Sequence, residues 1–121
     1  MKVSVRITRN FKKEAKVLFK KYQSLGADLA KLESELISNP KLGTPLGFNA
    51  YKIRLQIKSK GKGKSGGARV ISYLETILVE QADHTKGEIT VNLISIYDKS
   101  DVATISDKEL KNLIDSFYKN K

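Results

Sequence analysis

The chain has 121 residues, 40% of them hydrophobic, with no cysteine and one histidine, so it supports a single domain without disulfides, and neither a zinc site nor any other metal or cofactor is expected. It has neither an apolar run near the ~20 residues of a membrane span nor the apolar core of a signal peptide, which predicts a soluble cytoplasmic protein without membrane contact. Its 23 Lys and Arg residues exceed its 13 Asp and Glu residues, and the net charge of +10 points to a polyanionic partner.

The first part of the chain predicts a strand followed by a helix. Residues 2–8 alternate between apolar and polar side chains, as in a half-buried strand. Thr8 or Asn10 is suited to cap the helix that follows, and Gly26 is its expected end. The apolar residues of this helix recur at helical spacing and include Phe11, Ala15, Leu18 and Tyr22.

A second helix and a strand with basic residues come next. The helix is predicted from Asp28 to the Ser-Asn-Pro sequence that precedes residue 41, and it forms a helical hairpin with the first. Residues 40–50 hold both prolines and two glycines, which predicts a loop. In residues 50–58, AYKIRLQIK, apolar and polar side chains alternate, so Lys52 and Arg54 are expected on the face away from the core.

The segment KSKGKGKSGG, residues 58–67, has the glycine spacing of two phosphate-binding motifs. It matches G-x-G-x-x-G, and its Gly-Lys-Ser sequence matches the end of a P-loop. Both motifs need a helix directly after the loop, because the N–H groups at the helix N-terminus hold the phosphate. The next residues, ARVISYLETILVE, are rich in β-branched residues and predict a strand, so a nucleotide site is not expected.

The remaining residues predict a hairpin and a C-terminal helix. Residues 68–81 form one long strand, or two with a bend near Glu75, and a tip at DHTKG leads into a strand over 88–98. His84 lies in that tip and is expected to be a bystander rather than a catalyst. The final helix begins with a capping box, and its apolar stripe serves as core or as a partner surface. The box is formed by Ser106 and Glu109, and the stripe by Leu110, Leu113, Ile114 and Phe117.

These segments predict an α+β fold. An N-terminal strand and a helical hairpin pack on an antiparallel sheet of about four strands, and a C-terminal helix is added. Helices on one face leave the other face open and cationic. This face is expected to present Lys52, Arg54, Arg69, Tyr97 and Lys99. The alternative for the basic run between residues 52 and 69 is a solvated lysine-rich hairpin.

Several of these segments together resemble the RelE/ParE superfamily of toxins from type II bacterial toxin–antitoxin systems. The similarity covers the helical hairpin, the Tyr-Lys-Ile-Arg-Leu strand, the Gly-Lys-Ser-Gly-Gly sequence before Arg-Val-Ile, and the Ile-Tyr-Asp-Lys-Ser-Asp sequence after the last strand. The similarity therefore extends over almost the whole chain. Within the superfamily, the chain resembles the RelE-like branch more closely.

The resemblance implies a ribosome-dependent endoribonuclease, without metal or cofactor, that cuts messenger RNA in the ribosomal A site. In this branch the 2′-hydroxyl of the RNA attacks the adjacent phosphodiester, and basic residues stabilise the charge that develops. The corresponding catalytic residues here are Lys52, Arg54, Arg69 and Lys99. The two arginines suit phosphate clamping and Lys52 suits proton transfer.

The same resemblance implies further contacts with RNA. Lysines of the loop are expected to grip the backbone, and two tyrosines are candidates to stack on a base, with burial in the core as the alternative for each tyrosine. These residues are Lys58, Lys60, Lys62, Lys64, Tyr73 and Tyr97. Where RelE has a C-terminal tyrosine, this chain has Ile105, and it lacks the Glu/His pair of some relatives.

Two other functions fit the same resemblance or the same charge. ParE-like members bind DNA gyrase and cut nothing, so a non-catalytic gyrase inhibitor is one alternative, and a plain RNA-binding module is another. The implied partners are the ribosome with its message and a cognate antitoxin, an acidic segment of which would cover the cationic face or the apolar stripe of the last helix. The implied assembly is a homodimer or a toxin–antitoxin hetero-oligomer.

Overall fold

The computed structural model describes residues 2–61, 63, 66–82, 84–99 and 105–120. It is an α+β fold in which an N-terminal strand and two helices precede the other strands, and a third helix ends the chain. The elements are β1 (Lys2–Ile7), α1 (Arg9–Lys21), α2 (Leu25–Ser38), β2 (Thr44–Gly47), β3 (Ala50–Leu55), the 3₁₀ helix η1 (Lys58–Lys60), β4 (Ala68–Gln81), β5 (His84–Asp98) and α3 (Asp107–Lys119). None of the helices described has the length and apolar character needed to cross a membrane.

The strands form one five-stranded sheet in the order β1-β5-β4-β3-β2. The four strands from β2 to β5 are antiparallel, as predicted, whereas β1 lies parallel to β5 and makes the sheet mixed. The next strand along the chain, β2, lies at the opposite edge of the sheet from β1, and α1 and α2 connect the two strands.

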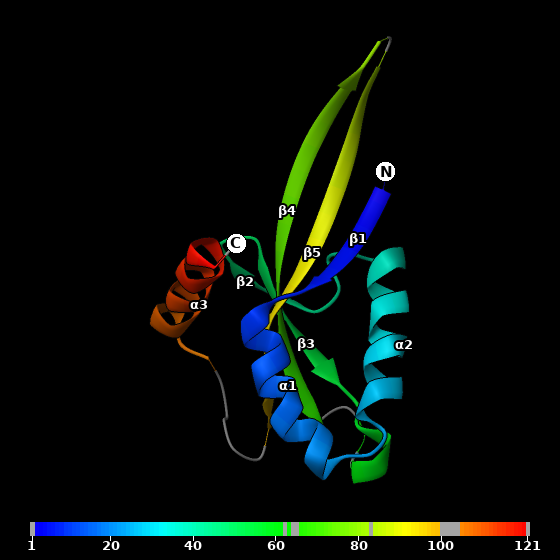
Figure 1. Cartoon of the computed structure of the whole chain (residues 1–121), viewed down its shortest axis with the longest axis vertical. Helices are drawn as coiled ribbons and strands as arrows, with labels where there is room; N and C mark the ends of the chain where they lie inside the picture. The colour runs from blue at the N-terminus through cyan, green and yellow to red at the C-terminus, as the bar shows by residue number, and fades with distance from the viewer. Residues whose placement is uncertain (1, 62, 64–65, 83, 100–104, 121) are drawn as a thin grey trace.

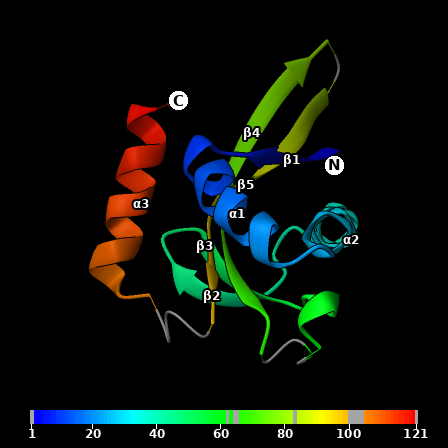
Figure 2. The same ribbon diagram turned by 60° about the horizontal axis from the view of Figure 1, so that its bottom comes forward.

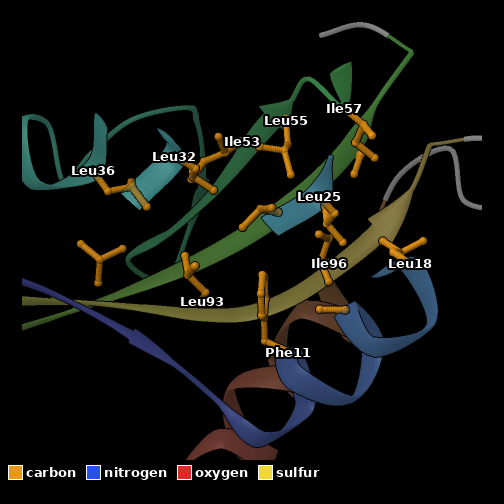
Figure 3. Close-up of a cluster of buried hydrophobic side chains, with 14 of the residues drawn as sticks. Phe11, Leu18, Leu25, Leu32, Leu36, Ile53, Leu55, Ile57, Leu93 and Ile96 are labelled. Carbon is orange, nitrogen blue, oxygen red and sulfur yellow. The ribbon is translucent and has the colours of Figure 1, made fainter. Parts of the chain in front are cut away.

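Helices cover both faces of the sheet. Helices α1 and α2 pack on one face and α3 packs on the other, as Figure 1 and Figure 2 show. The larger core lies under α1 and α2, and Figure 3 shows some of its side chains. Its members include Phe11, Leu18, Leu25, Leu32, Leu36, Ile53, Leu55, Ile57, Leu93 and Ile96. The expectation that the second face is open was therefore wrong in part.

The capping box and the apolar stripe of α3 are confirmed. The Glu109 N–H donates to the Ser106 hydroxyl at 3.1 Å, and the Ser106 N–H donates to the Glu109 carboxylate at 3.4 Å. The stripe packs on β3, β4 and β5 in a second core, so it belongs to the fold. This second core contains Ala50, Ile71, Tyr73, Ile94, Leu110 and Phe117, with Leu113 and Ile114 packed against it.

The boundaries of the helical hairpin differ from the predicted ones. Thr8 caps α1, because its hydroxyl accepts from the Phe11 N–H at 3.3 Å. Gly26 does not end this helix: α1 ends before Tyr22, and Gly26 lies in the first turn of α2. The reason is burial, since Leu25, the first residue of α2, is fully enclosed in the core.

The sheet also differs in detail from the pattern read along the chain. The predicted loop over 40–50 contains β2, whose four residues are too few to show a period. The strand predicted over 50–58 ends at Leu55, and η1 follows. Strand β4 is one continuous strand, and β5 begins at His84 rather than at residue 88. The hairpin of β4 and β5 is therefore longer than predicted.

The edge of β5 that β1 leaves uncovered is closed by side chains of α1. The register of β1 with β5 ends at Leu93, so the groups beyond it need other partners. Asn10 donates to the Ile94 carbonyl at 2.9 Å, and Glu14 accepts from the Ser95 hydroxyl at 2.9 Å and from the Ile96 N–H at 3.4 Å. These contacts fix α1 against the part of β5 that leads to the candidate site.

Gly67 provides a test of the join between β3 and β4. A Cβ at this position would overlap the Leu55 carbonyl oxygen, whereas a Cβ at Gly26 would lie at an ordinary 3.6 Å from Phe19. We expect Gly67→Ala to lower the free energy of unfolding by about 1–3 kcal/mol, as overpacking does. Gly26→Ala, the matched control in a helix, should be neutral or raise it by up to about 1 kcal/mol. Urea unfolding followed by circular dichroism measures both, and equal stability of Gly67→Ala and wild type would contradict the close contact.

Candidate nucleic-acid interface

Three of the predicted residues form one row across the sheet. Arg54 of β3 lies opposite Arg69 of β4, and Arg69 lies opposite Tyr97 of β5. Because Ile53 and Leu55 point into the core under α1 and α2, alternation places Arg54 on the face that α3 partly covers. Lys52 lies two residues before Arg54 on the same face. The predicted cationic residues of β3 and β4 are therefore adjacent.

The basic side chains of this row differ in exposure. Arg54 is exposed and Lys52 is half-buried, whereas Arg69 is only 4% exposed. The Arg69 guanidinium donates from Nη1 to the Ala68 carbonyl at 3.2 Å. Burial lowers the pKa of Arg69, and the nearby charge of Arg54 lowers it further. An arginine stays protonated at neutral pH in proteins, so Arg69 is a cation held in place below the exposed Arg54.

This arrangement places like charges side by side. Two like charges directly opposite each other in a sheet destabilise it by an amount on the order of 0.2–1 kcal/mol. Within the described residues, neither Lys52 nor Arg54 forms a salt bridge. An anion bound between the two arginines would relieve their repulsion, and a phosphate matches the planar fork of a guanidinium.

Tyr97 extends the row with a polar group. Its side chain is half-buried, and its hydroxyl oxygen is buried without a hydrogen-bond partner among the described residues. Burial raises the pKa of Tyr97, which the charge of Arg69 opposes and that of Glu109 supports. The hydroxyl is therefore protonated at neutral pH. A cavity of about 340 Å³ adjoins it and is lined by Glu14, Ser95, Ile105, Glu109, Asn112, Leu113 and Ser116.

Lys99 lies at the end of the same strands. It follows β5, and its backbone N–H donates to the Gly67 carbonyl at 3.2 Å, two residues before Arg69. Its side chain is exposed. Lys99 therefore flanks the row. Its place in the site was predicted only from the resemblance to the family.

A second cavity opens at the outer edge of β3. Strand β2 pairs only with residues 50–52, so the rest of this edge faces α2. The cavity has a volume of about 350 Å³, and its lining includes the cations Lys31, Lys52, Arg54 and Lys58 and the acids Asp28 and Glu35. Lys31 was not predicted as a site residue, because its position in α2 gives no sign in the sequence of its approach to β3. Lys58 is exposed.

Lys60 does not take the exposed position predicted for a lysine that grips RNA. Its ammonium forms a salt bridge with Asp98 at 2.7 Å, and the side chains of the two residues are 9% and 1% exposed. The Tyr22 hydroxyl donates to the same carboxylate at 2.6 Å, and the ammonium lies 5.5 Å from the centre of the Tyr22 ring. The Lys60 side chain is therefore part of a buried ion pair rather than of the surface. Lys62 and Lys64 lie outside the described residues.

Tyr73 is part of the core under α3 rather than a platform for a base. It is 9% exposed, packs edge-on against Phe117 with ring centres 5.8 Å apart, and shares a 2.6 Å hydrogen bond with the Tyr118 hydroxyl. Burial and this hydrogen bond raise the pKa of Tyr73 to about 12. Of the two alternatives for this tyrosine, burial in the core is the one observed. Ile105 packs against the same core.

His84 and metal ligands play no part in the row. His84 is the first residue of β5, whereas Tyr97 is the second-last, so the two lie at opposite ends of this strand. No group of three or more potential metal ligands occurs in the described part of the chain.

Searches against protein-family models and against solved structures found no match for the chain.

The buried ion pair predicts a large loss of stability when one partner is neutralised. We expect Asp98→Asn to lower the free energy of unfolding by about 3–5 kcal/mol, because it leaves the Lys60 ammonium enclosed without its counterion. Glu33→Gln, the same chemical change at an exposed position of α2, should shift it by less than about 0.5 kcal/mol. Chemical unfolding measures both, and a small effect at Asp98 would argue against a buried pair.

The same cluster predicts a loss of stability at alkaline pH. The hydrogen bond to Asp98 raises the pKa of Tyr22 above 10.0. Burial lowers the pKa of Lys60, but the hydrogen bond and charge of Asp98 outweigh it and raise that pKa above 10.5. A group with a raised pKa in the folded state stabilises the fold below its ordinary pKa and loses this effect as the pH passes its folded value. The free energy of unfolding should therefore fall above pH 10, and less steeply in Tyr22→Phe. An equal slope in both proteins would exclude a contribution of Tyr22.

Proposed function

We propose that this protein is the toxin of a type II toxin–antitoxin pair and acts as a RelE-like endoribonuclease on ribosome-bound messenger RNA. The observation that carries the proposal is the pairing of Arg54 with Arg69 across β3 and β4, with Lys52 on the same face. Several cations on one face of a sheet suit a ribose-phosphate backbone. Together with the resemblance to RelE-like toxins, this favours phosphodiester cleavage over simple RNA binding.

The two arginines have distinct parts in the proposed reaction. The 2′-oxygen of the RNA attacks the adjacent phosphorus, the bond to the 5′-oxygen of the next nucleotide breaks, and negative charge builds on the non-bridging oxygens. Arg69, buried and bonded to the Ala68 carbonyl, is already oriented before substrate binds, which is the requirement for electrostatic stabilisation. Arg54, which is exposed, reaches the phosphate from the solvent side.

The remaining residues handle protons and position the nucleotide. Lys52, which lies on the same face as Arg54 and is half-buried, acts in its neutral amine form: it takes the proton of the 2′-hydroxyl and returns it to the departing 5′-oxygen. Tyr97 lies opposite Arg69 with its hydroxyl buried, and its ring packs beside the site as part of the wall against which the nucleotide lies. Lys99, at the end of the row, binds a neighbouring phosphate.

The proposed partner is an antitoxin whose acidic segment covers the cationic row. The apolar stripe of α3 was the other surface considered, but it packs on the sheet through Leu110 and Phe117. The row keeps exposed positive charge at Arg54 and Lys99. Opposite charges would speed the encounter of the two proteins at low salt.

Arg54 allows the proposed activity to be tested without loss of the fold. We expect Arg54→Gln to reduce cleavage of ribosome-bound message by about 10²–10³-fold, the usual effect of removing one donor from a developing oxyanion. Lys16→Gln makes the same charge change at an exposed position of α1, on the other side of the sheet, and should cut as wild type does. Arg69 is unsuitable for this comparison, because its replacement would also disturb buried packing.

The measurement is primer extension on a message translated by purified ribosomes, with circular dichroism as the check on folding. Cleavage by wild type and Lys16→Gln with loss in Arg54→Gln supports the proposal. If Arg54→Gln cuts as wild type does, the row that contains Arg54 has no part in the mechanism. If wild type cuts no message and instead blocks DNA supercoiling by gyrase, the proposal of a nuclease is wrong.

A further inference from the structure

The outer edge of β3 is uncovered beyond its short pairing with β2. Strand β2 pairs with residues 50–52, and the cavity of about 350 Å³ begins where this pairing ends. Helix α2 forms the other wall of this cavity through Asp28, Lys31, Leu32 and Glu35. The cavity is therefore a groove between the edge of a strand and a helix.

The backbone of β3 points hydrogen-bonding groups into this groove. A Cβ at Gly43, which directly precedes β2, would overlap the Lys52 carbonyl oxygen, so this oxygen points away from β4. Because backbone groups alternate in direction along a strand, those of Arg54 and of Gln56, just beyond the strand, point the same way. On this side no described residue is hydrogen-bonded to the backbone of Arg54 or Gln56. The N–H and C=O groups of both residues are therefore open to another strand.

The groove fits a peptide better than a nucleic acid. Outward carbonyl oxygens would repel the phosphates of RNA, whereas an added strand supplies an N–H donor for each of them. Addition of a strand to a sheet edge takes affinity from these backbone bonds and specificity from pockets for alternate side chains. Such contacts are offered by apolar residues of the core under α1 and α2 that also line the groove, namely Leu32, Leu42, Ile53 and Leu55.

Charge indicates that the added strand is acidic. The lining carries four basic and two acidic side chains. One of the acids, Asp28, already accepts from the Ser24 hydroxyl at 2.7 Å and from the Lys58 N–H at 3.3 Å. A strand beside β3 places every second residue on the face that carries Lys52 and Arg54, and the residues between them on the apolar side. The partner that fits therefore alternates acidic and apolar residues.

We propose that the edge of β3 beyond Lys52 takes up an extended segment of a partner protein, with alternating acidic and apolar residues, as a strand added between β3 and α2. The acidic residues of this segment lie beside Arg54 and Lys52, and its apolar residues pack near Leu55. The segment competes with RNA, because both bind Arg54. The inference rests on the proposed function in one respect, the identification of the partner as the antitoxin.

Binding is measured by fluorescence anisotropy of the full chain with a short labelled peptide of alternating aspartate and valine, without RNA or ribosomes. We expect a Kd of ~1–100 μM for this peptide. A peptide with the same residues arranged in two blocks, and a peptide of alternating lysine and valine, should bind at least ~10-fold more weakly. Absence of binding, or equal binding of the block peptide, would overturn the proposal.

Lys31 tests the wall formed by α2 without a change to the proposed catalytic residues. Lys31→Glu should weaken binding of the alternating peptide at least ~10-fold, because it places a carboxylate beside an acidic strand. Lys16→Glu makes the same change at an exposed position of α1 outside the lining and should bind as wild type does. Equal binding by Lys31→Glu and wild type would contradict the proposed position of the segment.

Gln56 tests the edge itself. Gln56→Pro removes an outward N–H but none that bonds to β4, so it should also weaken binding of the alternating peptide. Unchanged binding by this variant would show that the backbone edge is not used. If circular dichroism shows that Gln56→Pro fails to fold, the comparison of Lys31→Glu with Lys16→Glu decides.

Hydrogen exchange shows where the peptide lies. The amides of Arg54 and Gln56 should gain protection when the peptide binds, whereas those of Ile53 and Leu55, which point toward β4, should be protected with and without it. If a single-stranded RNA protects the Arg54 and Gln56 amides and the peptide does not, the groove binds RNA and the proposal is wrong. A chain that binds the alternating peptide in this way but cuts no message supports the inference and refutes only the proposed nuclease activity.

Discussion

The buried ion pair between Lys60 and Asp98 holds together the end of the molecule where the cationic residues gather. Asp98 is the last residue of β5, Lys60 ends η1, and Tyr22, which also bonds to Asp98, directly follows α1. One carboxylate therefore joins three segments that are far apart in sequence. A buried charge is stable only with its partners in place, and Asp98 lies opposite Ala68 in the same register that places Tyr97 opposite Arg69.

The basic residues near the candidate site differ in how they are paired and how exposed they are. Lys60 is neutralised inside, Arg69 is buried and oriented by a carbonyl, and Arg54 meets solvent. A sheet fixes side chains on one face at a short spacing, so it keeps Arg54 and Arg69 close despite their repulsion.

Sequence patterns predicted the fold well where local physics decides it. The two-residue period of residues 50–58 placed Lys52 and Arg54 on the correct face, and the capping box placed the start of α3 at Ser106. Boundaries that depend on packing were predicted less well. Gly26 was read as a helix end, but burial of Leu25 begins α2 just before it. Strand β2 was missed because four residues show no period.

The sequence by itself determined the α+β class, the alternation that gathers Lys52 and Arg54 on one face, and the excess of positive charge, because these follow from composition and from the period of the backbone. Only the tertiary structure decided which cations stay available. Lys60 is buried in a salt bridge with Asp98, and Tyr73 is covered by α3. The residues next to them in sequence predicted neither contact. The physical reason is that burial and ion pairing depend on residues distant along the chain, whose approach is settled only when the sheet and its helices pack.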